Sequence, residues 1–385
     1  MNIEDKFKDN KQVSEIISLF GSVPEVIGYS LFPTLIGGIL CYEVTLSAQK
    51  CSISLSDAMD RKVDPEQFAQ MLGLPLIVHD IPVIYFVDEA ISASWWQRSA
   101  WAELESRSVV YDPGDYPIQA PTITSDEHIL SMRKEQHVVY GGCEIGQITG
   151  LGIFGSLGGI VWDQSTDEPY WIGAAHVMCD NLWFSNVADI DNFGLFCPVE
   201  EVGTPIHQNR PSRKIGELKA CGTYNDGSFN NVDAAIATID SGIYYNDQKF
   251  GVLGVIPNAS AATPSVGSYV RGAGRTSSLL SAEIGNTAYV VTQDGGPSIL
   301  TYKTVAGSGY LKPGDSGTRV FLRDNNNPVG LFVGYHVVSS FMTIMPALSI
   351  EEDLGVTFTA PEGWSPNLPP VEIVDNKKPF IFIFH

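Results

Sequence analysis

The chain has 385 residues, 44% of them hydrophobic, which is the composition of a globular protein long enough for two or three domains. Its 44 acidic and 23 basic residues give a formal net charge of −21, and this argues against a partner gripped through phosphates or anionic lipids, so no nucleic acid is expected. The N-terminus lacks the apolar core of a signal peptide, and every apolar run is interrupted before the ~18 residues of a membrane helix, so neither is expected.

The first third of the chain predicts mixed helices and strands. Apolar residues between Val13 and Phe20 recur every three or four positions, which indicates a short amphipathic helix. Asp64 as an N-cap, Pro65 in the first turn and Gly73 after the last turn predict a second helix near residues 65–72. Strand-like apolar runs lie at residues 26–32, 39–46 and 76–87.

A proline-rich stretch at residues 111–127 marks a domain boundary. We therefore expect an N-terminal α+β domain over residues 1–120, which regulates the rest or positions a substrate, and a linker over 121–137. Trp95, Trp96 and Trp101 precede this stretch, and core or interdomain packing is favoured over a ligand platform.

From Val138 onward the chain becomes rich in glycine, with short β-branched runs separated by turn residues. This pattern predicts a barrel or sandwich over residues 138–360. The tail, residues 361–385, ends in the alternating Phe380 to Phe384 run, an aggregation-prone strand unless it is covered. We expect the tail to dock on a sheet edge or on a second copy of the chain, so a homo-oligomer is a candidate partner state.

Three short motifs carry the residues of a nucleophilic catalyst. His176 lies in Ala-Ala-His-Val, Asp233 in Asn-Val-Asp-Ala-Ala-Ile-Ala, and Ser316 in Pro-Gly-Asp-Ser-Gly. A serine hydroxyl attacks a carbonyl only when an imidazole takes its proton, and the imidazole needs a carboxylate that fixes its tautomer. Asp226 and Asp240 are rival carboxylates, but neither lies in an apolar strand that would bury it.

The glycines around Ser316 predict an oxyanion hole. Gly314 permits backbone geometry that other residues rarely adopt, so the N–H groups of Gly314 and Ser316 can both point at a developing oxyanion. An ordinary β-turn is the alternative for an isolated Gly-Asp-Ser-Gly sequence.

These motifs, in this order, resemble the trypsin/chymotrypsin-like serine peptidases. Ala174 to His176, Val232 to Ala237 and Gly314 to Gly317 are similar to the family's three catalytic segments. The resemblance implies a mainly β fold, a chymotrypsin-like double β-barrel over residues 138–360, with the small α+β domain before it. Further segments are similar to intracellular bacterial trypsin-like proteins and plant narrow-leaf proteases: 158–161, 215–218 and 272–276.

The resemblance also implies where the substrate pocket lies. Its walls would be Tyr310 and Leu311 before the nucleophile turn, and Phe332, Gly334 and Tyr335 after it. No acidic residue stands among them, and a buried unpaired cation is costly, so we expect an apolar residue before the scissile bond rather than Arg or Lys. His336 is the rival determinant, because Gly-Tyr-His is similar to a phrase of glutamyl- and glutamine-specific relatives.

In zymogens of this family the aspartate at the position of Asp315 receives a freed N-terminal ammonium. Val138 to Gly142 is faintly similar to the family's activation site, but no basic residue directly precedes it. Activation by cleavage there is therefore the disfavoured reading, and control by the N-terminal domain or the tail is favoured.

The six cysteines are expected to be free thiols in a cytoplasmic protein. Secreted relatives carry a cysteine directly after the catalytic histidine, where this chain has Val177, and no signal peptide is recognised. No Cys or His spacing matches a metal site. The glycine pattern at residues 150–155 precedes strand-like sequence rather than a helix, so no metal and no cofactor are expected.

The sequence thus predicts an intracellular serine endopeptidase acting on a specific protein or peptide. A catalytically weak trypsin-fold protein that binds peptides or acts as a scaffold is the alternative. A hydrolase of small esters shares the same chemistry and stays open.

Overall fold

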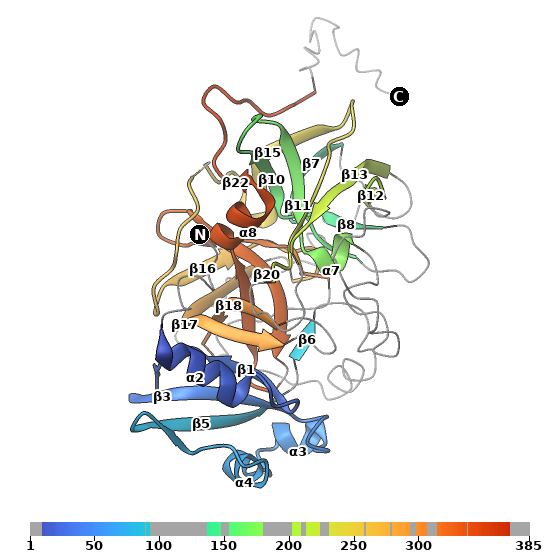
Figure 1. Cartoon of the computed structure of the whole chain (residues 1–385). Coiled ribbons are helices and arrows are strands. Elements are labelled where there is room, and N and C mark those ends of the chain that lie inside the picture. Colours follow the sequence, from blue (N-terminus) through green and yellow to red (C-terminus); the bar gives the residue numbers. More distant parts are fainter. Residues whose placement is uncertain are drawn as a thin grey trace, which may run out of the picture.

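The computed structural model describes residues 10–88, 90–92, 137–147, 154–179, 202–208, 213–223, 231–257, 259–277, 279–292, 298–305, 314–336 and 338–369. The chain is mainly β, and its sheets form the chymotrypsin-like double β-barrel that the motifs predict. In Figure 1 the N-terminal elements lie at one end, the second barrel in the middle and the first barrel beyond it.

The second barrel is a closed sheet. Its strands follow the order β16-β19-β20-β21-β18-β17, and β16 also pairs with β17, so the ends of the sheet meet. Their bounds are Tyr269–Gly272 (β16), Leu280–Thr292 (β17), Ser298–Thr304 (β18), Arg319–Leu322 (β19), Pro328–His336 (β20) and Phe341–Pro346 (β21). Closure removes free sheet edges inside the barrel, and side chains such as Val270, Phe332 and Ile344 fill its interior.

The first barrel has the order β22-β10-β11-β14-β13-β12-β8-β9. Its strands are β8 (Glu144–Gln147), β9 (Gly155–Ser156), β10 (Gly159–Asp163), β11 (Pro169–Gly173), β12 (Pro205–Gln208), β13 (Arg213–Cys221), β14 (Ala235–Ala237) and β22 (Val356–Thr357). Trp162 and Trp171 are fully buried in its core. A separate parallel pair joins β7 (Val138–Gly141) to β15 (Tyr244–Phe250), and a short 3-10 helix, η5 (Gly251–Leu253), follows.

The N-terminal elements agree with their sequence signals. Asn10 caps α2 by accepting from the N–H groups of Gln12 and Val13, and Asp64 caps α4 in the same way, with Pro65 in its first turn. The elements are α2 (Lys11–Phe20), β1 (Val26–Ser30), β2 (Thr34–Ile36), β3 (Ile39–Ser47), α3 (Leu55–Met59), α4 (Pro65–Met71), β4 (Ile77–Val78), β5 (Ile81–Asp88) and β6 (Ala90–Ser92). The predicted helices are confirmed, as are the predicted strands, with β4 and β5 dividing the third.

The helices and strands of residues 11–88, called the N-terminal layer below, share a sheet with the second barrel. Strand β17 is 13 residues long; its first part pairs with β16, and residues Tyr289 to Val291 pair with β1. The core of the layer also includes Val290 and Leu300 of the barrel. The predicted domain limits, 1–120, 121–137, 138–360 and 361–385, stay predictions, and Trp95, Trp96 and Trp101 lie outside the described residues.

The chain after the second barrel returns to the first. Helix α8 (Ala347–Leu354) leads into β22, and Trp364 then stacks on Tyr245 of β15, with an interplanar angle of 11°. Asn367 Nδ2 donates to Ile243 O at 2.9 Å. The Phe380 to Phe384 run lies outside the described residues.

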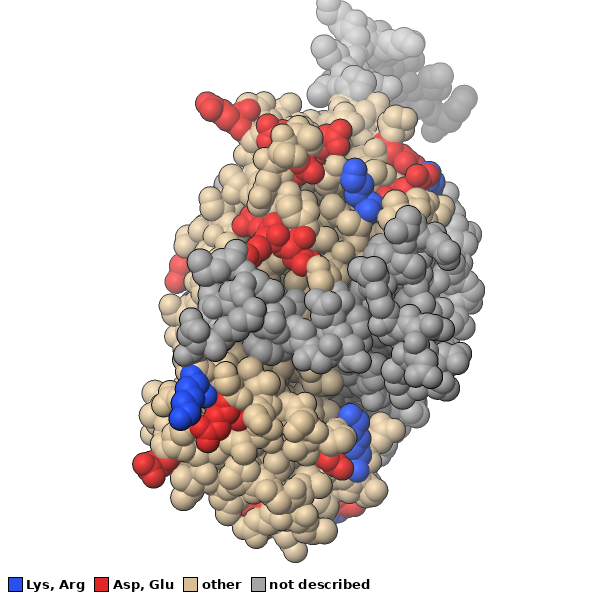
Figure 2. All heavy atoms as spheres, viewed as in Figure 1, with Lys and Arg blue, Asp and Glu red and all other residues tan. Residues whose placement is uncertain are grey.

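The visible surface carries more acidic than basic side chains (Figure 2). Across the described part of the chain, no helix is both long and apolar enough to cross a membrane.

A buried ion pair joins the N-terminal layer to the second barrel. Lys303 of β18 contacts Glu43 of β3, and both side chains are less than a tenth exposed. The Lys303 ammonium also lies 3.9 Å from the Phe341 ring and 4.9 Å from the Tyr289 ring. Burial lowers the pKa of Lys303 well below its usual range, and Cys41 opposes this shift to a smaller degree.

We expect Glu43→Leu to destabilise the fold by about 3–5 kcal/mol, because it leaves the Lys303 ammonium buried without its carboxylate. Glu43→Leu/Lys303→Met should be markedly more stable than the single variant, since both charges are then gone. Urea unfolding of the two variants and of the parent measures this. Equal stability of the single and double variants would contradict the pairing.

Candidate active site

Two paired strands of the first barrel bring His176 and Asp233 together. His176 lies in α7 (Ala175–Met178), which begins two residues after the end of β11, and Asp233 lies two residues before the start of β14. Gly173 of β11 pairs with Ala235 of β14, which places the two segments side by side. His176 Nδ1 donates to Asp233 Oδ2 at 2.6 Å, and the His176 backbone N–H donates to Asp233 Oδ1 at 3.1 Å. Both side chains are fully buried, so the carboxylate fixes the ring's orientation and leaves Nε2 as the basic nitrogen.

Backbone contacts hold Ser316 between the two barrels. Ser156 N donates to Ser316 O at 2.8 Å from the first barrel, and Gly317 N donates to Phe332 O at 2.8 Å in the second. A Cβ on Gly317 would lie 3.0 Å from the nitrogen of Ala174, two residues before His176. The Ser316 turn therefore packs against the segment that carries the imidazole. Ser316 Oγ is buried and has no hydrogen bond among the described residues, which is common before a substrate tightens a catalytic site.

Gly314 occupies a conformation suited to glycine, with φ of 96°. Ser156 Oγ donates to Gly314 O at 2.9 Å and so fixes the direction of the peptide group between Gly314 and Asp315. Arg275 lies over the same residue, because a Cβ on Gly314 would come within 2.2 Å of its Nη1. Arg275 is in turn held by Glu144 Oε2 at 2.6 Å. Sequence reasoning missed the roles of Ser156 and Glu144, which carry no local signal; Arg275 lies in a segment already noted for its resemblance.

The Asp315 carboxylate is bound by the segment that follows Arg275. Its Oδ1 accepts from Thr276 N at 2.9 Å and Ser277 N at 3.0 Å, and its Oδ2 accepts from Ser277 Oγ at 2.5 Å. Strand β7, which contains the faint activation-site resemblance, is paired with β15, and its Val139 is fully buried. These contacts occupy Asp315 with groups from its own chain and bury the segment that cleavage would have to free.

The predicted pocket residues lie in different settings. Tyr310 and Leu311 are outside the described residues. Phe332 and Tyr335 are buried in the core of the second barrel, and Gly334 pairs with Ser92 of β6.

His336, the rival specificity residue, is 1% exposed and stacks on Phe341 with ring centroids 3.9 Å apart. Burial, and to a lesser degree the nearby Lys303 ammonium, lowers the pKa of His336 well below its usual range. A neutral buried ring is a poor receptor for a substrate carboxylate. Of the rival acids, Asp240 lies 3.5 Å from Lys214 Nζ and Asp226 is outside the described residues.

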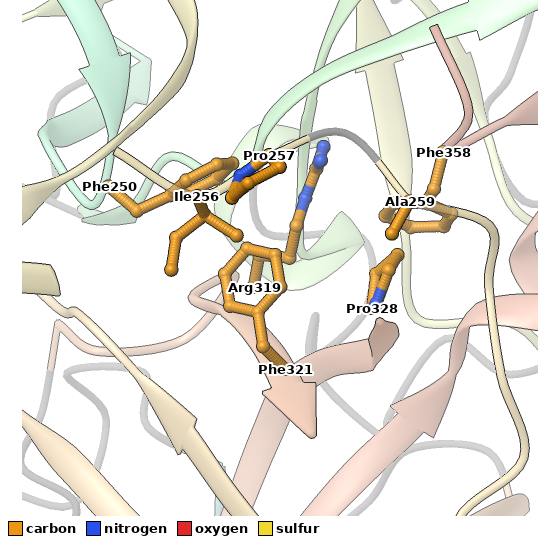
Figure 3. Close-up of a pocket in the computed structure, with 8 residues that line it drawn as sticks. All are labelled: Phe250, Ile256, Pro257, Ala259, Arg319, Phe321, Pro328 and Phe358. Atoms are coloured by element: carbon orange, nitrogen blue, oxygen red, sulfur yellow. The ribbon is translucent and has the colours of Figure 1, made fainter. Parts of the chain in front are cut away.

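A small cavity lies elsewhere, around Arg319 (Figure 3). Its lining is apolar apart from Arg319, and it comprises Phe250, Ile256, Pro257, Ala259, Phe321, Pro328 and Phe358. Arg319 Nη2 donates to Ile160 O at 2.5 Å, and the guanidinium carbon lies 4.7 Å from the Phe358 ring centre. Arg319 therefore ties β19 to β10. Within the ranges described, no cluster of His, Cys, Asp and Glu could hold a metal ion.

The expectation of six free thiols is wrong for two cysteines. Cys179, directly after α7, forms a disulfide with Cys221 at the end of β13. The expectation considered only the position directly after His176, which is Val177. Cys179 lies three residues after His176, and the fold brings it next to Cys221. Cys41, Cys51 and Cys143 form no disulfide, and Cys197 is outside the described residues. The cytoplasmic location stays a prediction, and the disulfide removes one observation on which it rested.

No protein-family model and no curated protein matches the sequence. Among solved structures, the fold is similar to Thermobifida fusca protease A, at 17% identity and a TM-score of 0.42, covering 58% of this chain and 100% of that one. It is also similar to Cellulomonas bogoriensis chymotrypsin, at 19% identity and a TM-score of 0.40, covering 58% and 99%. A third similar structure is a glutamic acid specific serine protease, at 18% identity and a TM-score of 0.40, covering 57% and 99%. These neighbours are serine proteases of the trypsin/chymotrypsin fold.

We expect thiol titration of the unfolded, unreduced protein to count four thiols, and six after reduction, because Cys179 and Cys221 are joined. Cys179→Ala/Cys221→Ala should leave the first count unchanged and lower the free energy of unfolding by about 2–4 kcal/mol. Six thiols before reduction would show that the bond does not form.

The buried neutral His336 predicts a loss of stability in acid. Its pKa is lower in the folded than in the unfolded protein, so below pH ~6.5 the unfolded chain takes up a proton that the folded chain does not. The free energy of unfolding should then fall by up to about 1.4 kcal/mol per pH unit from this group. His336→Phe should therefore gain stability relative to the parent between pH 7.5 and pH 5, measured by urea unfolding. An unchanged stability difference at the two pH values would refute this reading.

Proposed function

We propose that this chain is a serine endopeptidase that cleaves a protein substrate through His176, Asp233 and Ser316. The observation that carries the proposal is the fully buried hydrogen bond between His176 Nδ1 and Asp233 Oδ2, at 2.6 Å, beside the Ser316 turn. A buried imidazole held by a carboxylate next to a serine in a glycine turn is the arrangement that activates a hydroxyl.

In the proposed reaction Ser316 Oγ attacks the substrate carbonyl while its proton passes to His176 Nε2. Asp233 keeps Nδ1 protonated and stabilises the imidazolium. The N–H groups of Gly314 and Ser316 would bind the oxyanion, and the φ of 96° at Gly314 is a glycine conformation of the kind expected for this turn. His176 then gives its proton to the leaving amine, and water attacks the acyl-enzyme with His176 again as the base.

An apolar residue before the scissile bond remains the proposed preference. The support is from the sequence: the predicted wall residues Phe332, Gly334 and Tyr335 include no carboxylate, and none stands beside them to receive a basic side chain. The runner-up function, peptide binding with little turnover, has the Ser316 Oγ without a hydrogen bond in its favour.

Ser316→Ala should abolish labelling by a fluorophosphonate probe and cleavage of peptide amides. His176→Ala should lower kcat by roughly 10⁶ and Asp233→Asn by roughly 10⁴, because triad members act as a unit. Ser22→Ala, at an exposed serine after α2, is the matched control and should behave as the parent does. Undiminished amide cleavage by Ser316→Ala would exclude the proposal, and labelling of Ser316 with hydrolysis of esters but not amides would favour a small-ester hydrolase.

A further inference from the structure

Strand β6 of the N-terminal segment completes one edge of β20. It pairs antiparallel, with Ser92 opposite Gly334, Ile91 opposite Tyr335 and Ala90 opposite His336. Strand β21 already pairs with the same stretch of β20, from Gly334 to His336, on its other edge. Strand β6 must therefore lie on the β19 side of β20, beyond the point where β19 ends, and Figure 1 shows it beside the end of β20.

The same edge of β20 holds the Ser316 turn. Gly317 N donates to Phe332 O at 2.8 Å, and Phe332 N donates to Thr318 O at 2.9 Å. Gly334, where β6 ends, is two residues further along, which corresponds to about 7 Å of strand. Because the pairing is antiparallel, β6 runs from His336 toward Phe332, so its C-terminal end points toward the nucleophile turn.

An extended peptide binds a free sheet edge by adding a strand to it. Beyond β19 and the Ser316 turn, the next stretch of this edge of β20 is the one that pairs with β6, and it includes Gly334 and Tyr335, two of the predicted pocket residues. The position and direction of β6 are those required of a peptide whose C-terminal side reaches Ser316. We propose that β6 is an intramolecular inhibitory strand, which a protein substrate must displace from β20 before it is cleaved; this inference rests on the proposed peptidase function.

Asp88, at the end of β5, anchors β6 in place. Its buried carboxylate accepts from Val338 N at 2.8 Å and Ser339 N at 2.9 Å, in the turn between β20 and β21. Its carbonyl accepts from Ala48 N at 2.8 Å, within the N-terminal layer. The layer and the turn are thereby locked together two residues before β6 begins. A strand tethered in this way competes with a substrate for the edge of β20. It acts as an intramolecular ligand at an effective concentration near the millimolar range.

The test compares two double variants of the full chain. Ile91→Pro/Ser92→Pro removes at least one donor of the ladder, because bonded and non-bonded pairs alternate along an antiparallel strand. Ile91→Ala/Ser92→Ala keeps both N–H groups and is the matched control. Fluorophosphonate labelling of Ser316, kcat/KM for a peptide amide, and inhibition by a synthetic peptide of residues 87–92 are measured for each.

We expect the proline variant to gain about tenfold or more in kcat/KM, mainly through a lower KM, while the alanine variant stays near the parent. The synthetic peptide should inhibit the proline variant competitively and more strongly than the parent. Labelled Ser316 with equal kcat/KM in all three proteins would overturn the inhibitory role alone. Absence of labelling at Ser316 in every protein would overturn the peptidase function and this inference with it.

Thermal unfolding checks that the proline variant is folded. Should it not fold, Asp88→Ala is the second variant, because it releases the turn after β20 without touching the ladder. It should raise kcat/KM in the same direction, and an unchanged value would count against the inhibitory strand.

Discussion

The backbone hydrogen bonds along the β19 side of β20 are the constraint on which the rest of the site depends. Within nine residues, β20 binds β19, then the turn that carries Ser316, and then β6. A strand in a closed barrel cannot shift its register without moving every side chain to the other face. The position of Ser316 is therefore fixed by the same ladder that decides whether a peptide can lie next to it.

The first barrel supplies the proposed base, His176, together with the Asp233 carboxylate. Pairing of β11 with β14 sets His176 against Asp233, and the Cys179–Cys221 disulfide ties the end of α7 to β13, which also pairs with β14. The proposed nucleophile, Ser316, comes from the second barrel, so the three proposed residues meet only where the two barrels contact each other. Ser156 joins the two halves there, since it bonds to Ser316, Gly314 and Arg275.

The N-terminal layer is built into the second barrel. Strand β17 extends past β16 to pair with β1, and Lys303 reaches from β18 to Glu43 of β3. A buried ion pair contributes little net stability but strongly disfavours separation of its partners, because either charge alone would be buried without compensation. The N-terminal layer, which is followed in the chain by β6, is therefore held to the second barrel by the Lys303–Glu43 ion pair, whose separation is costly.

The local chemistry and most of the element types follow from short stretches of the sequence. Capping at Asp64, the apolar periodicity of the first helix and the motifs around His176, Asp233 and Ser316 act over a few residues, and each is readable from the chain. Which distant residues contact each other depends instead on how the whole chain packs. The Cys179–Cys221 bond, the Ser277 hydroxyl on Asp315, the Glu144–Arg275 pair and the place of β6 all join segments far apart in the chain. Short sequence patterns encode local backbone preference and burial, whereas strand order and register come from packing the whole core, so no local signal could have placed these contacts.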